Sequence, residues 1–163
     1  MKHVGAADSF LAGAIGEPGE RTFLLELRAD GDVSWFLVEK RQVAALALES
    51  AQVLEETGFS GAGATTGSDG LEPPDAVKFR VGQIDLVYTE VSGLIDIVLQ
   101  PVDPERDEAV GFSLTPVQLD RMARAAAAAV ERGRPACPRC GLAMDAEGHS
   151  CPVDNGDLRE HRP

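Results

Sequence analysis

The sequence predicts an α+β fold in which a strand–strand–strand–helix unit occurs twice and a short C-terminal tail follows. Three observations predict this arrangement. Similar stretches recur in the same order in both halves, apolar residues alternate along the predicted strands, and an amphipathic helix follows the third strand of each unit. Short connections rich in turn residues favour antiparallel pairing. We therefore expect an antiparallel sheet with both helices on one face.

Three pairs of similar stretches define the repeat. They are FLAGAI at 10–15 and FRVGQI at 79–84, FLLEL at 23–27 and IDIVL at 95–99, and FLVEKRQVAALA at 36–47 and FSLTPVQLDRMA at 112–123. Because the three pairs keep one order along the chain, we infer a duplicated unit with repeats at about 9–57 and 76–133. The repeats form a body over residues 1–133, and residues 134–163 form a tail.

The strands of the first unit are predicted near 10–16, 21–29 and 32–39, with turn residues GEPGE and DGD between them. Along the middle strand, Phe23, Leu25 and Leu27 alternate with neighbours on the opposite face, which is typical of a half-buried strand. The strands of the second unit are predicted near 77–90, 94–101 and 109–114. Residues 58–75 are rich in Gly, Thr, Ser and Pro, so we expect a flexible loop between the units.

Each unit closes with a predicted helix. The first runs from about Arg41 to Thr57, and the second begins at Thr115, a residue suited to the N-cap. Pro116 fits the first helical position, and Gln118 completes a capping box with Thr115. The buried faces are predicted to carry Val43, Leu46, Ser50 and Leu54 in the first helix, and Leu119, Met122, Ala126 and Val130 in the second.

The tail contains the one strong chemical motif of the sequence, CPRCGLAMDAEGHSC over residues 137–151. A tight Cys-Pro-x-Cys-Gly turn points the thiols of Cys137 and Cys140 to the same side. His149 and Cys151, separated by one residue, can approach from the facing segment. Three thiolates and one imidazole form the closed tetrahedral set that Zn²⁺ prefers, and four protein ligands leave no open position for a substrate. The motif therefore predicts a structural zinc site in a zinc-knuckle tail.

Three other interpretations of the cysteines are open. A disulfide framework is disfavoured because the chain has 3 cysteines, an odd number, and we expect a reducing compartment. A redox-active Cys-x-x-Cys pair would open a helix after a strand, which the polar, Gly-containing flanks of this motif do not favour. Unbound thiols are the remaining alternative. The spacing of the thiols and the imidazole favours zinc over all three.

Charge and composition exclude several classes of function. The formal net charge is -12, which opposes binding to nucleic acid or to an anionic membrane by charge alone. No apolar run approaches the roughly 20 residues of a membrane span, and the start of the chain lacks a secretory signal. We expect a cytoplasmic protein. The acidic residues are scattered, which is typical of a solvated surface.

The stretches FLAGAIGEPGERTF at 10–23, EKRQVAAL at 39–46, LTPVQ at 114–118 and RPACPRCGLAMDAEGHSCPVDNG at 134–156 together resemble an uncharacterised family of Actinobacteria, the "domain of unknown function 3090" family. The resemblance spans nearly the whole chain. Because that family has no assigned activity, the resemblance implies a fold plan and a cysteine motif, and no function.

The sequence therefore favours a non-enzymatic, zinc-binding interaction or adaptor protein whose partner is another protein. No GxSxG, HExxH, GxGxxG or P-loop motif marks an enzyme. An enzyme with an unmarked active site on the body is the alternative. A third hypothesis is single-stranded nucleic-acid binding by a duplicated sheet of the Whirly kind. The acidic charge and the scarcity of aromatic residues oppose that hypothesis.

Overall fold

The computed structural model describes residues 1–61, 71–133, 135–144, 148–153 and 160–161, and within them seven strands form one sheet. Across the sheet the strands follow the order β1 (Lys2–Ala6), β7 (Val110–Leu114), β6 (Leu94–Pro101), β5 (Phe79–Thr89), β4 (Asp32–Val38), β3 (Thr22–Ala29) and β2 (Ser9–Ile15). The α+β class and the mostly antiparallel sheet are as predicted. The strands of both units lie within two residues of their predicted bounds.

Two pairs of neighbouring strands are parallel, which the sequence did not predict. Strands β2, β3 and β4 pair antiparallel, as do β5, β6 and β7, but β4 pairs with β5 in parallel and β1 pairs with β7 in parallel. Parallel neighbours need a long crossover, and a helix and its linker connect β4 to β5. The strand β1 was missed because its sequence, KHVGA, shows no clear alternation of apolar residues.

Strand β1 also brings the two edges of the sheet together. Only Ala7 and Asp8 separate β1, at one edge, from β2, at the other. The amide of Ala7 donates to the carbonyl of Ser113 on β7 at 3.0 Å, and the amide of Asp8 donates to the carbonyl of Arg28 on β3 at 2.8 Å. The sheet therefore curls until its first and last strands meet through these two residues.

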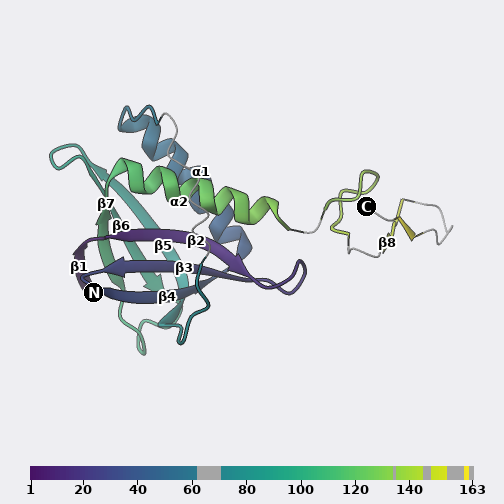
Figure 1. Cartoon of the computed structure of the whole chain (residues 1–163), viewed down its shortest axis with the longest axis horizontal. Helices are drawn as coiled ribbons and strands as arrows, with labels where there is room; N and C mark the ends of the chain where they lie inside the picture. Colours follow the sequence, from purple (N-terminus) through teal and green to yellow (C-terminus); the bar gives the residue numbers. More distant parts are fainter. Residues whose placement is uncertain (62–70, 134, 145–147, 154–159, 162–163) are drawn as a thin grey trace.

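Helices α1 (Lys40–Glu56) and α2 (Pro116–Glu131) lie side by side on one side of the sheet, which confirms that prediction (Figure 1). Each helix packs against the first predicted strand of the other unit. Helix α2, of the second unit, packs against β2, and helix α1, of the first unit, packs against β5. The two halves are therefore interlocked. This arrangement matches the predicted order of elements, while their origin by duplication stays a prediction.

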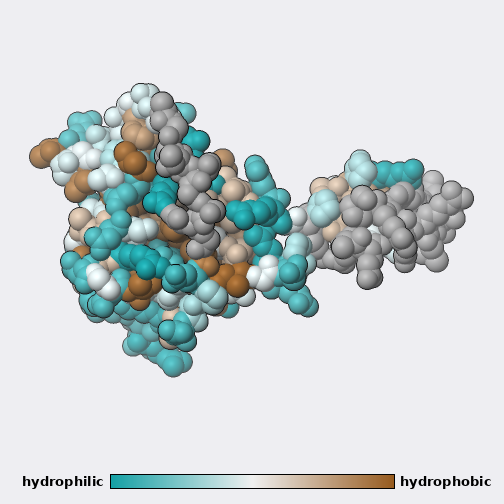
Figure 2. Space-filling model, in the orientation of Figure 1, coloured by the Kyte–Doolittle hydropathy of each residue, from teal (hydrophilic) through white to brown (hydrophobic). Residues whose placement is uncertain are grey.

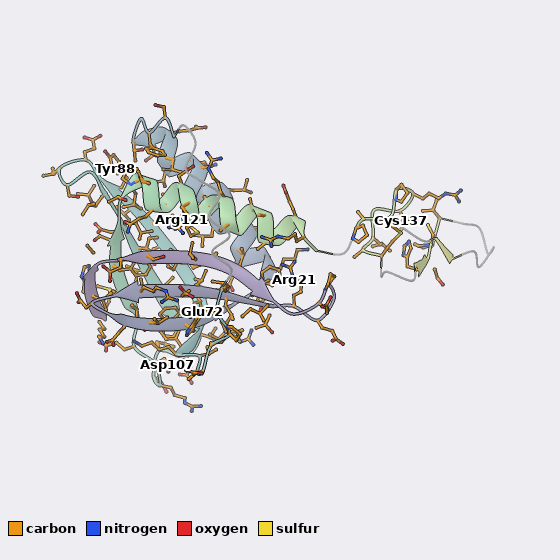
Figure 3. All side chains as sticks on the ribbon, in the orientation of Figure 1. Arg21, Glu72, Tyr88, Asp107, Arg121 and Cys137 are labelled. Carbon is orange, nitrogen blue, oxygen red and sulfur yellow. The ribbon has the colours of Figure 1, made fainter. Side chains whose placement is uncertain are left out.

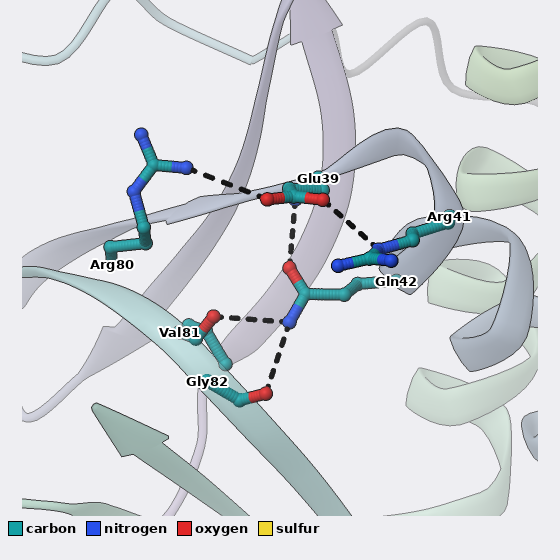
Figure 4. A network of polar contacts seen from close by, with 6 residues as sticks. All are labelled: Glu39, Arg41, Gln42, Arg80, Val81 and Gly82. Atoms are coloured by element: carbon teal, nitrogen blue, oxygen red, sulfur yellow. Dashed lines mark hydrogen bonds and ion pairs between the residues drawn. The ribbon is translucent and has the colours of Figure 1, made fainter. Parts of the chain in front are cut away.

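A glutamine near the start of each helix binds the helix to the other unit. Figure 4 shows the first of them, Gln42. The side chain of Gln42 accepts a hydrogen bond from the amide of Glu39 at 2.8 Å and donates to the carbonyl oxygens of Val81 and Gly82 on β5 at 3.0 and 3.3 Å. It thus caps its own helix and binds the strand that the helix covers. Glu39 also forms ion pairs with Arg41 and Arg80.

Gln118 makes the corresponding contacts at the start of α2. Its side chain accepts from the amide of Thr115 at 2.8 Å and donates to the carbonyl oxygens of Ala7 and Asp8 at 2.8 and 3.2 Å. The hydroxyl of Thr115 accepts from the amide of Gln118, which completes the predicted capping box.

Aromatic rings join the two halves inside the sheet. The Phe10 ring on β2 lies 4.8 Å from the Phe112 ring on β7, and the Phe36 ring on β4 lies 4.9 Å from the Phe79 ring on β5. All four side chains belong to one buried core, which also takes in the inner faces of both helices. In α2 the buried residues are Leu119, Met122, Ala126 and Ala129, so Ala129 takes the place predicted for Val130, which is half-buried.

Strand β3 is buried on both faces, and the prediction of a half-buried strand was wrong. Leu24 is 1% exposed and Glu26 is 3% exposed, although both face away from the main core. The chain that follows residue 70 crosses this outer face. The Leu71 side chain packs over Gly13, whose missing Cβ leaves the necessary space, and Glu72 forms an ion pair with Arg28 at 3.4 Å.

Residues 62–70, half of the loop predicted to be flexible at 58–75, lie outside the described residues, so its flexibility stays a prediction. The visible face of the body is largely hydrophilic, with hydrophobic side chains scattered over it (Figure 2). Within the described ranges, neither α1 nor α2 nor any other helix is long and apolar enough to cross a membrane.

Candidate metal centre

The first half of the site is a tight hairpin turn in the tail. Three backbone hydrogen bonds define it: the amide of Cys137 donates to the carbonyl of Leu142 at 2.7 Å, that of Gly141 to Cys137 at 2.9 Å, and that of Met144 to Pro135 at 2.8 Å. Ala136 and Ala143 form a β-bridge across the turn. Gly141 has a φ of 73°, a left-handed conformation that favours glycine. Cys137 and Cys140 are therefore held on one rigid loop.

The second half of the site is a short antiparallel pair of strands, β8 (His149–Ser150) and β9 (Glu160–His161). Strand β8 carries His149 and leads directly into Cys151. The tail, where Cys137 is labelled, follows the C-terminal end of α2 (Figure 3). Both halves of the site thus come from backbone structure that is local to the tail.

The four predicted ligands lie together. Their ligand atoms, three Sγ atoms and one imidazole nitrogen, are all within 4.8 Å of one another. The Sγ atoms of Cys137 and Cys151 are 3.9 Å apart, and the Sγ of Cys140 is 3.6 Å from Nε2 of His149. Tetrahedral zinc with its usual bond lengths requires about 3.8 Å between two sulfurs and about 3.5 Å between sulfur and nitrogen. These two donor distances are compatible with a tetrahedral metal site.

A small core encloses the site. Cys137 is 2% exposed, Cys151 is 8% exposed, and Met144, which is 3% exposed, belongs to the same buried cluster. The structure buries Met144 inside the tail and leaves Leu142 exposed. Cys137 and Cys151 are therefore shielded from solvent, while Cys140 is half-buried.

Backbone amides stabilise the thiolate form of Cys137 on the first loop. The amide of Cys140, and to a smaller extent that of Arg139, donates to the Cys137 sulfur and lowers the pKa of this thiol to about 6. Burial raises the pKa of the Cys140 thiol. Hydrogen bonds that favour one thiolate before metal arrives are suited to a metal ligand, since the thiolate is the form that binds.

In the part of the chain that the structure describes, this is the one cluster of Cys, His, Asp or Glu placed to hold a metal ion. His3, near the start of the chain, does not take part; it is exposed, and its Nδ1 accepts a hydrogen bond from the amide of Gly5. The sequence motif found every member of the cluster. The burial of Met144 beside the cysteines was not predicted, because an apolar residue in a loop has no period that shows which way it faces.

The chain matches the model of a known protein family. A family model described as "Protein of unknown function (DUF3090)" matches residues 3–151, a range that contains the sheet, both helices and all four clustered ligands. Neither the curated proteins nor the solved structures contain a match to this chain.

Proposed function

Because the chain belongs to the DUF3090 family of proteins of unknown function, whose description names no activity, we propose a function from its own residues. Cys137, Cys140, His149 and Cys151 bind one structural zinc ion. The folded tail then presents a small docking surface to another protein, so that the chain acts as a non-enzymatic adaptor. The body over residues 1–133 is the scaffold, and residues 134–163 form the docking module.

The spacing of the four ligand atoms is the observation that carries the zinc proposal. Three sulfurs and one imidazole are soft and borderline donors, which favour zinc over the harder ions Mg²⁺ and Ca²⁺. All four tetrahedral positions are filled by protein, which is typical of a structural centre, while catalytic zinc keeps one position for water. The three cysteines are not joined by disulfides, so their thiols can bind a metal. Reduced cysteines are typical of a reducing compartment, which supports a cytoplasmic location.

The exposed apolar side chains of the tail support the adaptor proposal. Leu142 is 54% exposed and Val153 is 56% exposed, and each lies within two residues of a zinc ligand. Metal binding fixes the backbone at both positions, which reduces the entropy lost when a partner binds. The tail has little apolar surface of its own to bury, so most of its order must come from the metal.

The adaptor proposal is tested by affinity capture with matched variants, followed by identification of the captured protein and measurement of direct binding. Leu142→Ser should lose the partner while keeping its zinc. Val117→Ser, at a body position that is 55% exposed, is the control and should keep the partner. Equal binding by both variants and the unchanged protein would contradict docking through Leu142. Loss of zinc from Leu142→Ser would instead count against the claimed separation of docking from metal binding.

A further inference from the structure

We propose that a cavity between the body and the tail binds a small oxyanion, a phosphate or carboxylate group, between Arg21 and Lys40. The cavity has a volume of about 200 Å³ and is lined by Gly19, Arg21, Phe23, Lys40, Gly133 and Ala143. It lies where the β2–β3 turn, the start of α1 and the end of α2 meet. This proposal goes beyond the zinc and adaptor functions, because it rests on charges of the body.

Among the described residues, both charged side chains that line the cavity are cations. Within the described ranges, neither Arg21 nor Lys40 forms an ion pair with a carboxylate, although the chain carries 27 acidic residues. Glu17 and Glu20 lie on the same turn as Gly19 but do not line the cavity. Two unneutralised cations facing one space favour an anion there.

Arg21 is held in position before any ligand arrives. Its guanidinium lies 5.2 Å from the centre of the Phe23 ring, and its Nη1 donates to the carbonyl oxygen of Ala129 at 2.8 Å. Arg21 lies below the C-terminal end of α2, on the side from which the chain leads to Cys137 (Figure 3). Since a guanidinium has five N–H groups, one bond to Ala129 leaves others to bind an oxyanion. The same bond offsets the negative end of the α2 dipole.

The glycines of the cavity make room for its charges. A Cβ on Gly133 would lie 2.7 Å from Nζ of Lys40, so a larger residue would displace the ammonium group. Gly19 has a φ of 96°, a conformation that favours glycine, and it brings bare backbone to the cavity wall. The backbone of the turn and of the α2 terminus can therefore approach a bound group closely.

Size and geometry limit the ligand to a single oxyanion group. The cavity is smaller than the roughly 300–1,000 Å³ of pockets that enclose whole drug-sized ligands. The planar fork of an arginine matches two oxygens of a carboxylate or a phosphate, and a lysine adds a compact positive charge. Gly133 follows the end of α2, and Ala143 lies on the hairpin that carries Cys137 and Cys140. A bound oxyanion would therefore contact both the body and the tail.

A second cavity supplies the control. It has about the same volume, 210 Å³, and it also has two cationic side chains in its lining, Lys2 and Lys78. Asp30 and Asp32 share that space, so its positive charges are compensated by carboxylates. The proposal therefore predicts binding at the first cavity and none at the second.

The test is an NMR titration of the ¹⁵N-labelled, zinc-loaded full chain with inorganic phosphate, and separately with acetate, at constant ionic strength. Amide shifts should saturate at Gly19 and Gly133. Lys40→Gln should weaken binding by about tenfold, the loss of one charge-assisted hydrogen bond, and Lys78→Gln should leave it unchanged. Lys40 is exposed and starts α1, so its replacement should not unfold the protein.

Saturation by phosphate alone or by acetate alone assigns the group, and both results support the proposal. The proposal is overturned if the amide shifts of Gly19 and Gly133 do not saturate with either anion. It is also overturned if Lys40→Gln binds the anion as tightly as the unchanged protein. Zinc content is measured on the same sample. A protein without zinc that still binds the oxyanion would contradict the proposed metal centre and leave this proposal standing.

Discussion

Replacing Gln42 by alanine tests how the two halves of the body are held together. The Gln42 side chain makes one hydrogen bond to its own helix start, at Glu39, and two to the backbone of β5, at Val81 and Gly82. Alanine keeps helix propensity but removes all three bonds. The carbonyl oxygens on β5 lose a partner, and the amide of Glu39 loses its cap.

The expected loss follows from these contacts. A typical intramolecular hydrogen bond contributes about 1 kcal/mol, and the shorter of the two bonds to β5 carries most of that contribution. The bond to the amide of Glu39 adds about 1 kcal/mol as part of a helix cap. We expect the free energy of unfolding to fall by about 2 kcal/mol. For a chain of this size, that lowers Tm by roughly 4–8 °C.

Urea unfolding followed by circular dichroism at 222 nm measures this loss. Gln118→Ala should give a similar loss, because Gln118 makes corresponding bonds to Thr115, Ala7 and Asp8. Gln52→Ala is the control, at an exposed position of α1, and should change stability by less than about 0.5 kcal/mol. The reasoning is refuted if Gln42→Ala and Gln118→Ala are no less stable than this control.

Three further predictions follow from single features of the structure. Ser50→Ala should leave the free energy of unfolding unchanged or raise it by up to about 1 kcal/mol, because the buried Ser50 hydroxyl has no hydrogen-bond partner within the described structure; a loss above about 1 kcal/mol would contradict this. Leu71→Ser should lower stability by about 1–2 kcal/mol through loss of the apolar cover over Gly13, while Val77→Ser, at an exposed position, should not; equal values in urea unfolding would count against the cover. Chelation of zinc, or Cys140→Ser, should melt residues 137–151 and make them sensitive to protease while α1 and α2 persist by circular dichroism; cooperative loss of the whole fold would show that the body is not independent.

The elements that the sequence predicted well are those set by neighbours along the chain. The capping box of Thr115 and Gln118 could be read from two residue types at a fixed spacing, and it forms. The Cys and His residues of the candidate metal centre were found for the same reason, since a turn that brings Cys137 and Cys140 together is a local structure. Local chemistry of this kind needs no knowledge of the rest of the fold.

The features that were missed depend on segments distant in sequence. The pairing of β1 with β7 joins the start of the chain to residues near 110, and nothing in KHVGA signals it. Glu26 lies on the outer face of β3, which the prediction of a half-buried strand left to solvent, but the segment that carries Leu71 and Glu72 covers that face. Likewise, Arg21 and Lys40 lie far apart in the sequence, and only the fold brings them to one cavity.

Metal analysis of the full chain, purified without chelator, tests the central claim most directly. Elemental analysis together with X-ray absorption should give one zinc ion per chain, with three sulfur ligands at about 2.3 Å and one nitrogen ligand at about 2.0–2.1 Å. Binding through Cys137, Cys140, His149 and Cys151 would leave no thiol free to react, since these include all 3 cysteines of the chain. Less than about half an equivalent of zinc, together with three freely titrating thiols, would contradict a zinc centre built from this set of donors.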